Sequence, residues 1–231
     1  MNCKEPSLDM NWQDQRQELV DTMRKLDQLG MVSGSSGNAS VRLPASGTQK
    51  KLFLVTPAGV SYDTLTAEQI VLVDDDMNPV GNTAESPTSE ALLHKAVYDQ
   101  RRDVEAIIHT HSVYASVQAV KAEAIPPIID EMVVYIGGTI EVSEYGFPGT
   151  PELAENSLKA LGDKRAAIIR NHGMFAVADT LKESLRVAEL VERVAKIYVN
   201  AKMSGTIIPV PDHAVEAERE MYLTRTGLKL T

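Results

Sequence analysis

The short apolar segments of this sequence constrain its fold most strongly, because they come in adjacent pairs. Segments 40–43 and 51–56 have the pattern of strands and are separated by a turn, and segments 166–169 and 174–177 repeat this arrangement. A regular βαβ array would place a helix after every strand. The pairing instead predicts an α/β protein with a mixed or antiparallel central sheet that is flanked by helices.

The remaining elements follow from hydrophobic periodicity and turn residues. Helices are expected over residues 13–29, 88–98, 112–120, 151–161, 181–203 and 212–230, and further strands over 70–73, 106–111 and 132–136. Ser112 is expected to cap its helix. The length of 231 residues predicts a single domain, 1–231. No glycine motif of the dinucleotide-binding or P-loop type occurs, which counts against both functions.

Charge and cysteine content narrow the classes of function. The formal net charge of −9 argues against a general nucleic-acid or anionic-membrane binder. A phosphorylated ligand stays open, since backbone N–H groups bind phosphate without net positive charge. The single cysteine, Cys3, excludes an intramolecular disulfide and fits a reducing compartment. Residues 1–11 lack the apolar core of a signal peptide, and no segment approaches the roughly 20 apolar residues of a membrane span. We therefore expect a cytoplasmic protein with no nucleic-acid or membrane partner.

Three of the five histidines lie where short apolar strands are expected to end. His109 and His111 are two residues apart, and side chains with this spacing point to the same side of a strand. His172 follows another apolar run, at a sharp Asn-His-Gly break. Three imidazoles that leave a coordination position open are typical of a catalytic site of the zinc type. A histidine pair also occurs without metal, and His94 fits a structural role on its helix.

Glu90 and three polar segments complete the candidate site. Glu90 lies in the first turn of an expected helix, where the helix dipole alone favours a carboxylate. It is also placed to serve as a movable metal ligand and general base. Segments 34–38 and 56–59 are rich in small residues, and residues 88–89 lie at a helix N-terminus, which favours phosphate. Each segment alone also fits a turn or a cap, but together they suggest a small phosphorylated substrate.

Read in order, these motifs resemble the class II aldolase/adducin family over residues 17–203. The matching segments are 37–42, 56–59, 87–90, 109–111, 137–138 and 171–174. The resemblance implies a three-layer α/β/α fold with a mostly antiparallel central sheet. It also implies a homotetramer with sites between subunits, and the C-terminal segment 212–231 is expected at a subunit interface.

The resemblance assigns roles to individual residues. It implies one divalent ion per subunit, most simply zinc with manganese and cobalt as alternatives, held by His109, His111, His172 and Glu90. The residues it implies for phosphate and substrate binding are Ser35, Gly37, Asn38, Ala58, Gly59, Thr88 and Ser89. Glu90 is expected to move the proton at the carbon next to the carbonyl. Glu131 stands where related aldolases place a tyrosine, and it is either a second acid/base or a salt-bridged loop carboxylate. Tyr222 is one helical turn from the position of a C-terminal catalytic tyrosine.

The implied reaction is cleavage of a ketose 1-phosphate to dihydroxyacetone phosphate and an aldehyde. Fuculose-, rhamnulose- and 5-deoxypentulose-1-phosphate are all plausible substrates. The main alternative is dehydration of methylthioribulose-1-phosphate with Glu131 as the base, followed by sugar-phosphate epimerase and decarboxylase activities. A non-enzymatic adducin-like module is the remaining alternative, and the presence of all four metal-ligand candidates argues against it.

Overall fold

The computed structural model describes residues 12–44, 51–81 and 83–228. Its strands are β1 (Asn38–Arg42), β2 (Phe53–Val55), β3 (Val71–Val73), β4 (Ala106–Thr110), β5 (Ala166–Ile169) and β6 (Gly173–Ala178). Its helices are α1 (Gln13–Gln28), the 3-10 helix η2 (Ala67–Gln69), α2 (Ala91–Gln100), α3 (Val113–Lys121), α4 (Asp130–Ile136), α5 (Pro151–Leu161), α6 (Leu181–Ser204) and α7 (Asp212–Thr226). Most boundaries lie within a few residues of those expected from the sequence.

The strands form one sheet in the order β3-β2-β1-β4-β6-β5, and every neighbouring pair is antiparallel. Adjacent strand pairs along the chain, β1 with β2 and β5 with β6, are neighbours in the sheet, as their spacing predicted. The register places Asn38 of β1 directly opposite His109 of β4. Polar side chains at the ends of the central strands therefore meet at one edge of the sheet.

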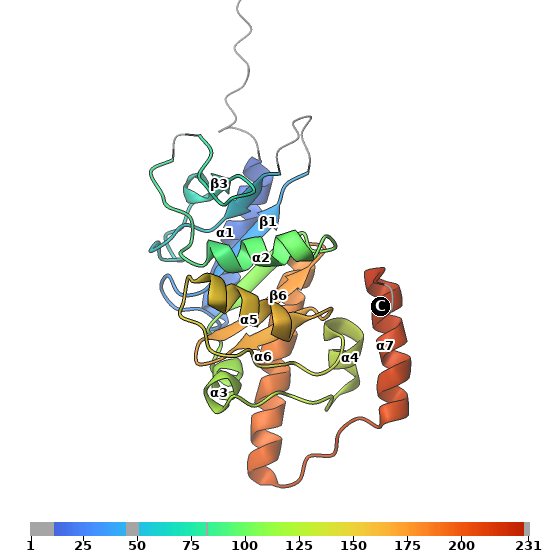
Figure 1. Cartoon of the computed structure of the whole chain (residues 1–231). Coiled ribbons are helices and arrows are strands. Elements are labelled where there is room, and N and C mark those ends of the chain that lie inside the picture. The colour runs from blue at the N-terminus through green and yellow to red at the C-terminus, as the bar shows by residue number, and fades with distance from the viewer. Residues whose placement is uncertain (1–11, 45–50, 82, 229–231) are drawn as a thin grey trace, which may run out of the picture.

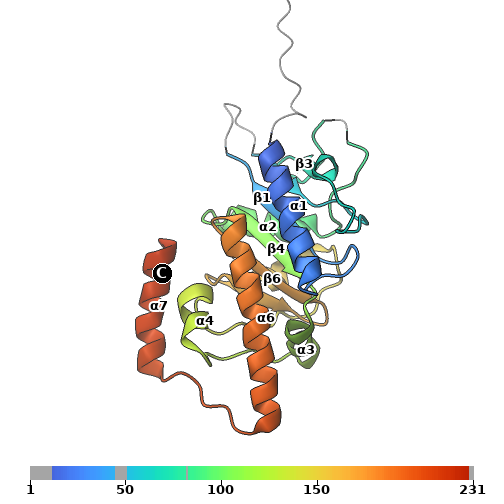
Figure 2. The same cartoon turned by 180° about the vertical axis from the view of Figure 1, so that it is seen from behind.

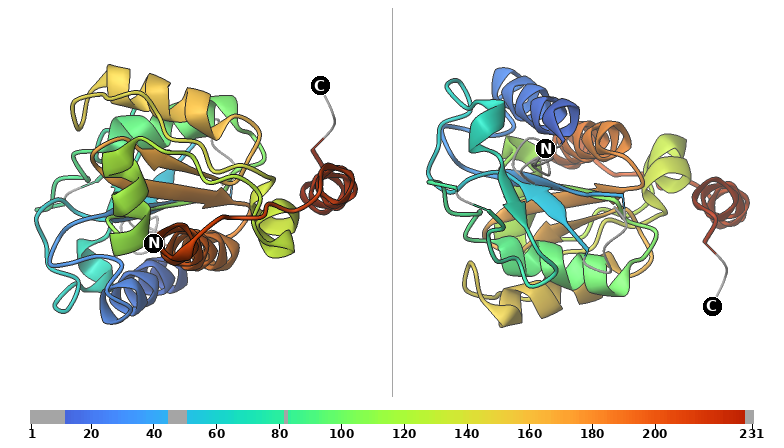
Figure 3. Two further views of the ribbon diagram at one scale, coloured as in Figure 1. Left: turned by 90° about the horizontal axis from the view of Figure 1, so that it is seen from below. Right: turned by 90° about the horizontal axis from the view of Figure 1, so that it is seen from above.

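Helices cover both faces of the sheet, which confirms the expected three-layer α/β/α architecture (Figures 1, 2 and 3). α2 and α5 pack on one face over an apolar cluster that includes Phe53, Ile107 and Phe175. α1 and α6 cover the other face over a second cluster that includes Val41 and Ile108, and α3 packs against α6. Successive strand residues thus alternate between two buried layers, as the pleat requires.

α4 corrects one expectation, because residues 132–136 are helical and not a strand. The buried side chains of this segment are Met132, Val133 and Ile136, whose spacing is that of one helix face. Gly137 ends the helix at φ 105°, in the left-handed region that favours glycine. A short apolar run with two valines fits a strand and a buried helix turn equally well, so periodicity alone misassigned it.

The N-terminus of α3 corrects a second expectation. Ser112 occupies the N-cap position, but its side chain makes no capping hydrogen bond. Instead the carboxylate of Glu192 on α6 accepts hydrogen bonds from the backbone N–H groups of Tyr114 and Ala115, at 2.9 and 3.0 Å. A carboxylate from a neighbouring helix therefore satisfies the donors of this helix end.

α7 stands apart from the sheet and packs against α4 (Figure 1). No helix in the described part of the chain is long and apolar enough to cross a membrane. The predictions made for Cys3, for the absence of a signal peptide in residues 1–11 and for part of the turn after β1 lie outside the described residues.

Candidate active site

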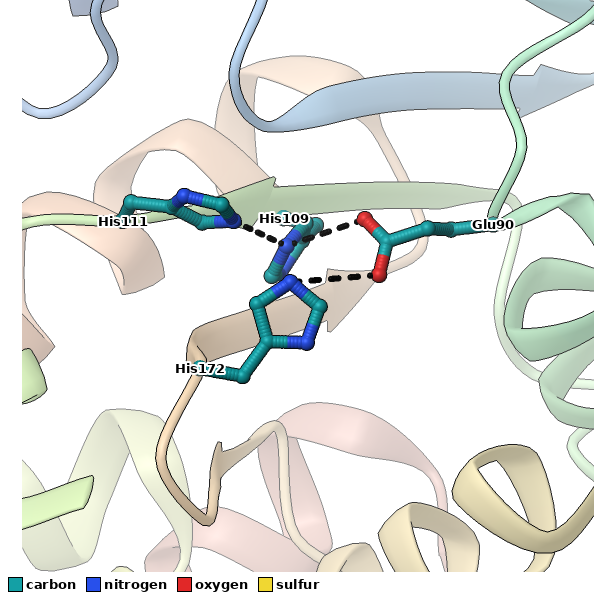
Figure 4. A group of neighbouring side chains, drawn as sticks. All are labelled: Glu90, His109, His111 and His172. Carbon is teal, nitrogen blue, oxygen red and sulfur yellow. Dashed lines mark hydrogen bonds and ion pairs between the residues drawn. The ribbon is translucent and has the colours of Figure 1, made fainter. Parts of the chain in front are cut away.

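The three predicted histidines converge at one edge of the sheet (Figure 4). His109 is the penultimate residue of β4, and His111 follows the end of the strand on the same side. His172 lies in the turn from β5 to β6, where Asn171 adopts a left-handed φ of 55°. At Gly173 a Cβ atom would lie 2.3 Å from the carbonyl oxygen of Thr110, so only glycine lets β6 approach β4 this closely.

The ligand atoms of the cluster face one another. The Nε2 atoms of His109 and His111 are 3.0 Å apart, and the ring centroids of the three histidines are 4.8 to 4.9 Å apart. Glu90 Oε2 lies 3.1 Å from His109 Nε2, and Glu90 Oε1 lies 3.3 Å from His172 Nε2. One ligand atom from each of the four residues lies within 4.8 Å of the others.

Burial and neighbouring charges set the protonation of the cluster. Burial lowers the pKa of His111 to about 4, and repulsion from His109 and His172 adds to this effect. Burial also lowers the pKa of His172. Burial opposes ionisation of Glu90, but the imidazoles of His109 and His172 outweigh it and hold the pKa of Glu90 well below its usual range. Burial opposes protonation of His109, but the Glu90 carboxylate outweighs it and raises the pKa of His109. The site therefore holds an ionised carboxylate among three imidazoles, and a metal ion would compete with a proton for His109.

The residues present fit a divalent ion. His109 is fully buried and its Nδ1 lies 2.8 Å from the carbonyl oxygen of Met174, so Nδ1–H donates and Nε2 faces the cluster. One ligand atom from each of the four residues faces a common point, where a cation would attract the carboxylate and the imidazole nitrogens. Three imidazoles and a carboxylate are also a ligand set that zinc prefers.

Glu90 differs from its expected position in the helix. α2 begins at Ala91, so Glu90 lies at the N-cap, where its side chain makes no capping hydrogen bond. The carboxylate is turned toward the histidines, and its side chain is only 9% exposed. The Glu90 carboxylate therefore points toward the histidines, as a metal ligand would, and not toward the N–H groups of α2.

A cavity of about 270 Å³ opens beside the histidine cluster. Its wall contains Glu90, His111 and His172 together with every residue expected to bind phosphate or substrate, namely Ser35, Gly37, Asn38, Ala58, Gly59, Thr88 and Ser89. Gly37 adopts a left-handed φ of 73°, and a Cβ atom there would lie 2.7 Å from the carbonyl oxygen of His109. The polar loop at Gly37 therefore reaches the histidine cluster because this position lacks a side chain.

Glu131 and Tyr222 are not brought to this cavity within one chain. Glu131 lies on α4, is half exposed and forms an ion pair of 2.8 Å with Arg193. Tyr222 lies on α7 and is fully buried, and its hydroxyl donates to the carbonyl oxygen of Asp163 at 2.8 Å. Their predicted catalytic roles therefore stay predictions.

The contacts of His94 with Asn38 and Ser40 were not predicted from the sequence. This residue is fully buried, and its two ring nitrogens face Asn38 and Ser40. The available signal was the spacing of Glu90, His94 and Tyr98 at intervals of four residues, which places all three on one helix face. Their partners lie more than 50 residues away in the sequence, so the spacing alone did not identify them.

Fold and site together define a class of protein, a three-layer α/β/α domain with a candidate metal centre at the sheet edge. Residues 17–199 match the sequence model of the family described as Class II Aldolase and Adducin N-terminal domain. This match covers most of the chain, which belongs to this family. Both the family and the fold expected from the sequence are thereby confirmed.

Three similar proteins illustrate the likeness. A 5-methylthioribulose-1-phosphate/5-deoxyribulose-1-phosphate aldolase of Escherichia coli is 33% identical and aligns with 92% of this chain and 94% of its own. An L-fuculose phosphate aldolase of Escherichia coli is 30% identical, over 92% of this chain and 95% of its own. A solved L-fuculose 1-phosphate aldolase structure superposes with a TM-score of 0.85 at 34% identity, covering 94% of this chain and 99% of the other. The predicted class of enzyme, a lyase of the aldolase type, agrees with all three.

Proposed function

We propose that this protein is a metal-dependent aldolase that cleaves a ketose 1-phosphate to dihydroxyacetone phosphate and an aldehyde. The observation that carries the proposal is the cavity, whose wall joins a cluster of three histidines and a glutamate to three loops of small polar residues. The similarity to aldolases named for fuculose, 5-deoxyribulose and methylthioribulose phosphates supports the same reaction.

We propose zinc as the resident ion, held by His109, His111, His172 and Glu90. When bound, such an ion supplies Lewis-acid polarisation of the substrate carbonyl and stabilises negative charge on the neighbouring oxygens. Manganese and cobalt accept the same ligands and stay alternatives. The chain's own contribution is to hold four ligand atoms together in a buried setting before the ion arrives.

The phosphate end of the substrate is proposed to lie against the loops around Gly37, Gly59 and Ser89. Ser89 lies two residues before α2, whose first turn presents backbone N–H groups and the positive end of the helix dipole. Small side chains at these positions leave room for phosphate oxygens to approach the backbone. The net charge of −9 makes such local donors necessary, since the chain has no general attraction for anions.

The proposed reaction breaks the bond between C3 and C4. The C4 hydroxyl loses its proton as the aldehyde forms, the electron pair of the broken bond passes to C3, and C3 then takes up a proton. Glu90 is proposed to handle the proton at C3, because its carboxylate is buried in the cavity wall and is turned toward the histidines. A second group must accept the proton of the C4 hydroxyl.

Glu131 is proposed as that second group, with Tyr222 as the alternative, each acting in the site of a neighbouring subunit of a homotetramer. This arrangement would reconcile a catalytic role with the distance of both residues from the cavity of their own chain. The solvent face of α3 supports it: Val113 and Val120 are 62% and 68% exposed, and Val117 lies between them at helical spacing. This apolar stripe begins two residues after His111, so a second copy that covered it would also approach the metal site.

The proposed compartment is the cytoplasm.

Dehydration of methylthioribulose-1-phosphate is the second candidate. It is favoured by the carboxylate at Glu131, which can serve as the base, and by the methylthioribulose name of one relative. That relative is nevertheless named an aldolase, so the likeness favours carbon–carbon cleavage even of this substrate.

A substrate panel separates these proposals. Zinc-loaded protein is given fuculose-, rhamnulose-, 5-deoxyribulose- and methylthioribulose-1-phosphate, and dihydroxyacetone phosphate is followed by a coupled dehydrogenase. We expect release that stops on addition of a chelator. Loss of water from methylthioribulose-1-phosphate without release of dihydroxyacetone phosphate would replace the aldolase by the dehydratase.

A further inference from the structure

A series of hydrogen bonds runs from Glu90 away from the cavity into the contact between β1 and α2. Asn38 Nδ2 donates to Glu90 Oε2 at 2.8 Å, and Asn38 Oδ1 lies 2.6 Å from His94 Nε2. Ser40 Oγ lies 2.6 Å from His94 Nδ1 and 2.8 Å from the hydroxyl of Tyr98. All five residues are buried. We call this series the Glu90–Tyr98 relay.

The relay follows from the geometry of a helix packed on a strand. Glu90, His94 and Tyr98 recur every four residues, and four residues of helix rise about 6 Å. Asn38 and Ser40 are two apart on β1, and two strand residues span roughly 6.6 Å. The two repeats nearly match, so side chains from helix and strand alternate along the contact.

The direction of every hydrogen bond in the relay can be assigned from its first member. A carboxylate oxygen only accepts, so the Asn38 amide must present nitrogen to Glu90 and oxygen to His94. The facing His94 Nε2 therefore carries a proton. Burial lowers the pKa of His94 to about 3, so the ring is neutral and its Nδ1 accepts from the Ser40 hydroxyl. The Ser40 oxygen in turn accepts from Tyr98.

We propose that His94 is a positioning residue whose Nε2–H locks the Asn38 amide with its nitrogen toward Glu90 and the cavity. Without this donor only the Glu90 carboxylate holds the amide in place, and a rotation by half a turn becomes easier. Its oxygen would then face the Glu90 carboxylate and the part of the cavity proposed to bind phosphate, and it would repel both. His94 does not line the cavity, so it acts only through Asn38. The effect on turnover rests on the proposed aldolase function, whereas the tautomer and the metal affinity do not.

Two substitutions at one position separate positioning from simple packing. His94→Phe keeps the ring volume but removes both ring nitrogens. His94→Gln provides an amide N–H that can replace Nε2 as donor to Asn38. Val97→Ala is the matched control, because Val97 is fully buried on the same helix and takes no part in the relay.

The tautomer is tested first, in zinc-free and zinc-loaded protein, by long-range proton–nitrogen NMR of the histidine rings. The signals of His94 are assigned from their loss in His94→Gln. We expect the proton on Nε2 in both states, and a proton on Nδ1 would overturn the proposal. Ser40→Ala removes only the hydroxyl that holds Nδ1, and we expect it to allow the other tautomer. This variant carries the test if His94→Phe does not fold.

Zinc affinity is tested second, by competition with a chromophoric chelator. Substituting a residue that orients a metal ligand typically weakens binding by about 10- to 100-fold. We expect this loss in His94→Phe, recovery to within a few-fold of wild type in His94→Gln, and no change in Val97→Ala. In turnover, kcat should fall more than KM rises. Unchanged zinc affinity in folded His94→Phe would overturn the proposal. If zinc affinity depends on His94 as expected but the wild type cleaves no ketose phosphate, the proposed function would be overturned and the role of His94 would stand.

Discussion

Two regions of the molecule hold their polar side chains in different ways. At the sheet edge, His109 is fully buried and lies within the hydrogen-bonded ladder of β4 and β6, Glu90 is also buried, and His111 and His172 are half-buried beside them. At α4 and α7, Glu131 is half exposed, and the hydroxyl of Tyr222 donates to the carbonyl oxygen of Asp163, in the turn between α5 and β5. We call these regions the metal region (Glu90, His109, His111 and His172) and the acid/base region (Glu131 and Tyr222).

Under the proposed function, rigid elements of one chain hold the metal region, and a neighbouring subunit supplies the acid/base region. The ends of central strands cannot move without breaking the sheet, so they suit ligands that must share one ion. α7 lies beside α4 and away from the sheet (Figure 2). Turnover that needs neither Glu131 nor Tyr222, or turnover by a single isolated chain, would contradict this division of the site.

Removing a ligand from the metal region should have the largest effect. His109→Ala takes away a central ligand, and we expect loss of bound zinc and a fall in turnover of roughly 10³-fold or more. Metal content is measured by mass spectrometry and folding by circular dichroism. His213→Ala, an exposed histidine on α7, is the control and should change neither. Turnover that survives without metal would contradict the assignment.

Glu131→Gln should have the next largest effect. Removing an acid/base group while leaving the metal in place should slow turnover by about 100-fold with zinc content unchanged. The rate is measured with saturating zinc. An unchanged rate would mean that Glu131 serves only its ion pair with Arg193.

Co-expression of Glu131→Gln with His109→Ala tests whether Glu131 acts in the site of a neighbouring subunit. If Glu131 acts in the site of a neighbour, mixed tetramers combine one intact metal region with one intact acid/base region, and about a quarter of the sites should recover. His109→Ala mixed with His172→Ala is the matched control and should recover nothing. A mixture without activity would place Glu131 outside its neighbour's site.

A smaller effect is expected at the phosphate end. Ser89→Ala removes a hydroxyl from the cavity wall, and a hydrogen bond to a charged group contributes about 1.5–3 kcal/mol. We expect kcat/KM to fall by roughly 10- to 100-fold, with zinc affinity unchanged. Inhibition by inorganic phosphate should weaken in parallel, and a variant that loses kcat/KM but keeps its inhibition would place phosphate elsewhere.

Tyr222→Phe should have the smallest effect. It removes the hydrogen bond to Asp163 and should lower the free energy of unfolding by about 1 kcal/mol. Thermal unfolding measures this change. A large loss of turnover with unchanged stability would instead give Tyr222 the catalytic role that its position in the sequence suggested.

Local patterns predicted most of the fold and the metal region. The two-residue spacing of His109 and His111 fixes a common side of a strand, and paired apolar runs fix antiparallel neighbours. Prediction failed where contacts in space decide. Residues 132–136 form the helix α4 and not the predicted strand, and Glu192 in place of Ser112 accepts from the first N–H groups of α3. The Glu90–Tyr98 relay was missed for the same reason, since it depends on the register between β1 and α2.

One divalent ion at the four-residue cluster is expected to be required for cleavage of the substrate. This requirement is tested by titrating metal-free protein with zinc while dihydroxyacetone phosphate release is followed. Activity should rise linearly and level off at one ion per chain, and His109→Ala should stay inactive throughout. Full turnover by the metal-free protein, or a rise that His109→Ala shares, would contradict the account.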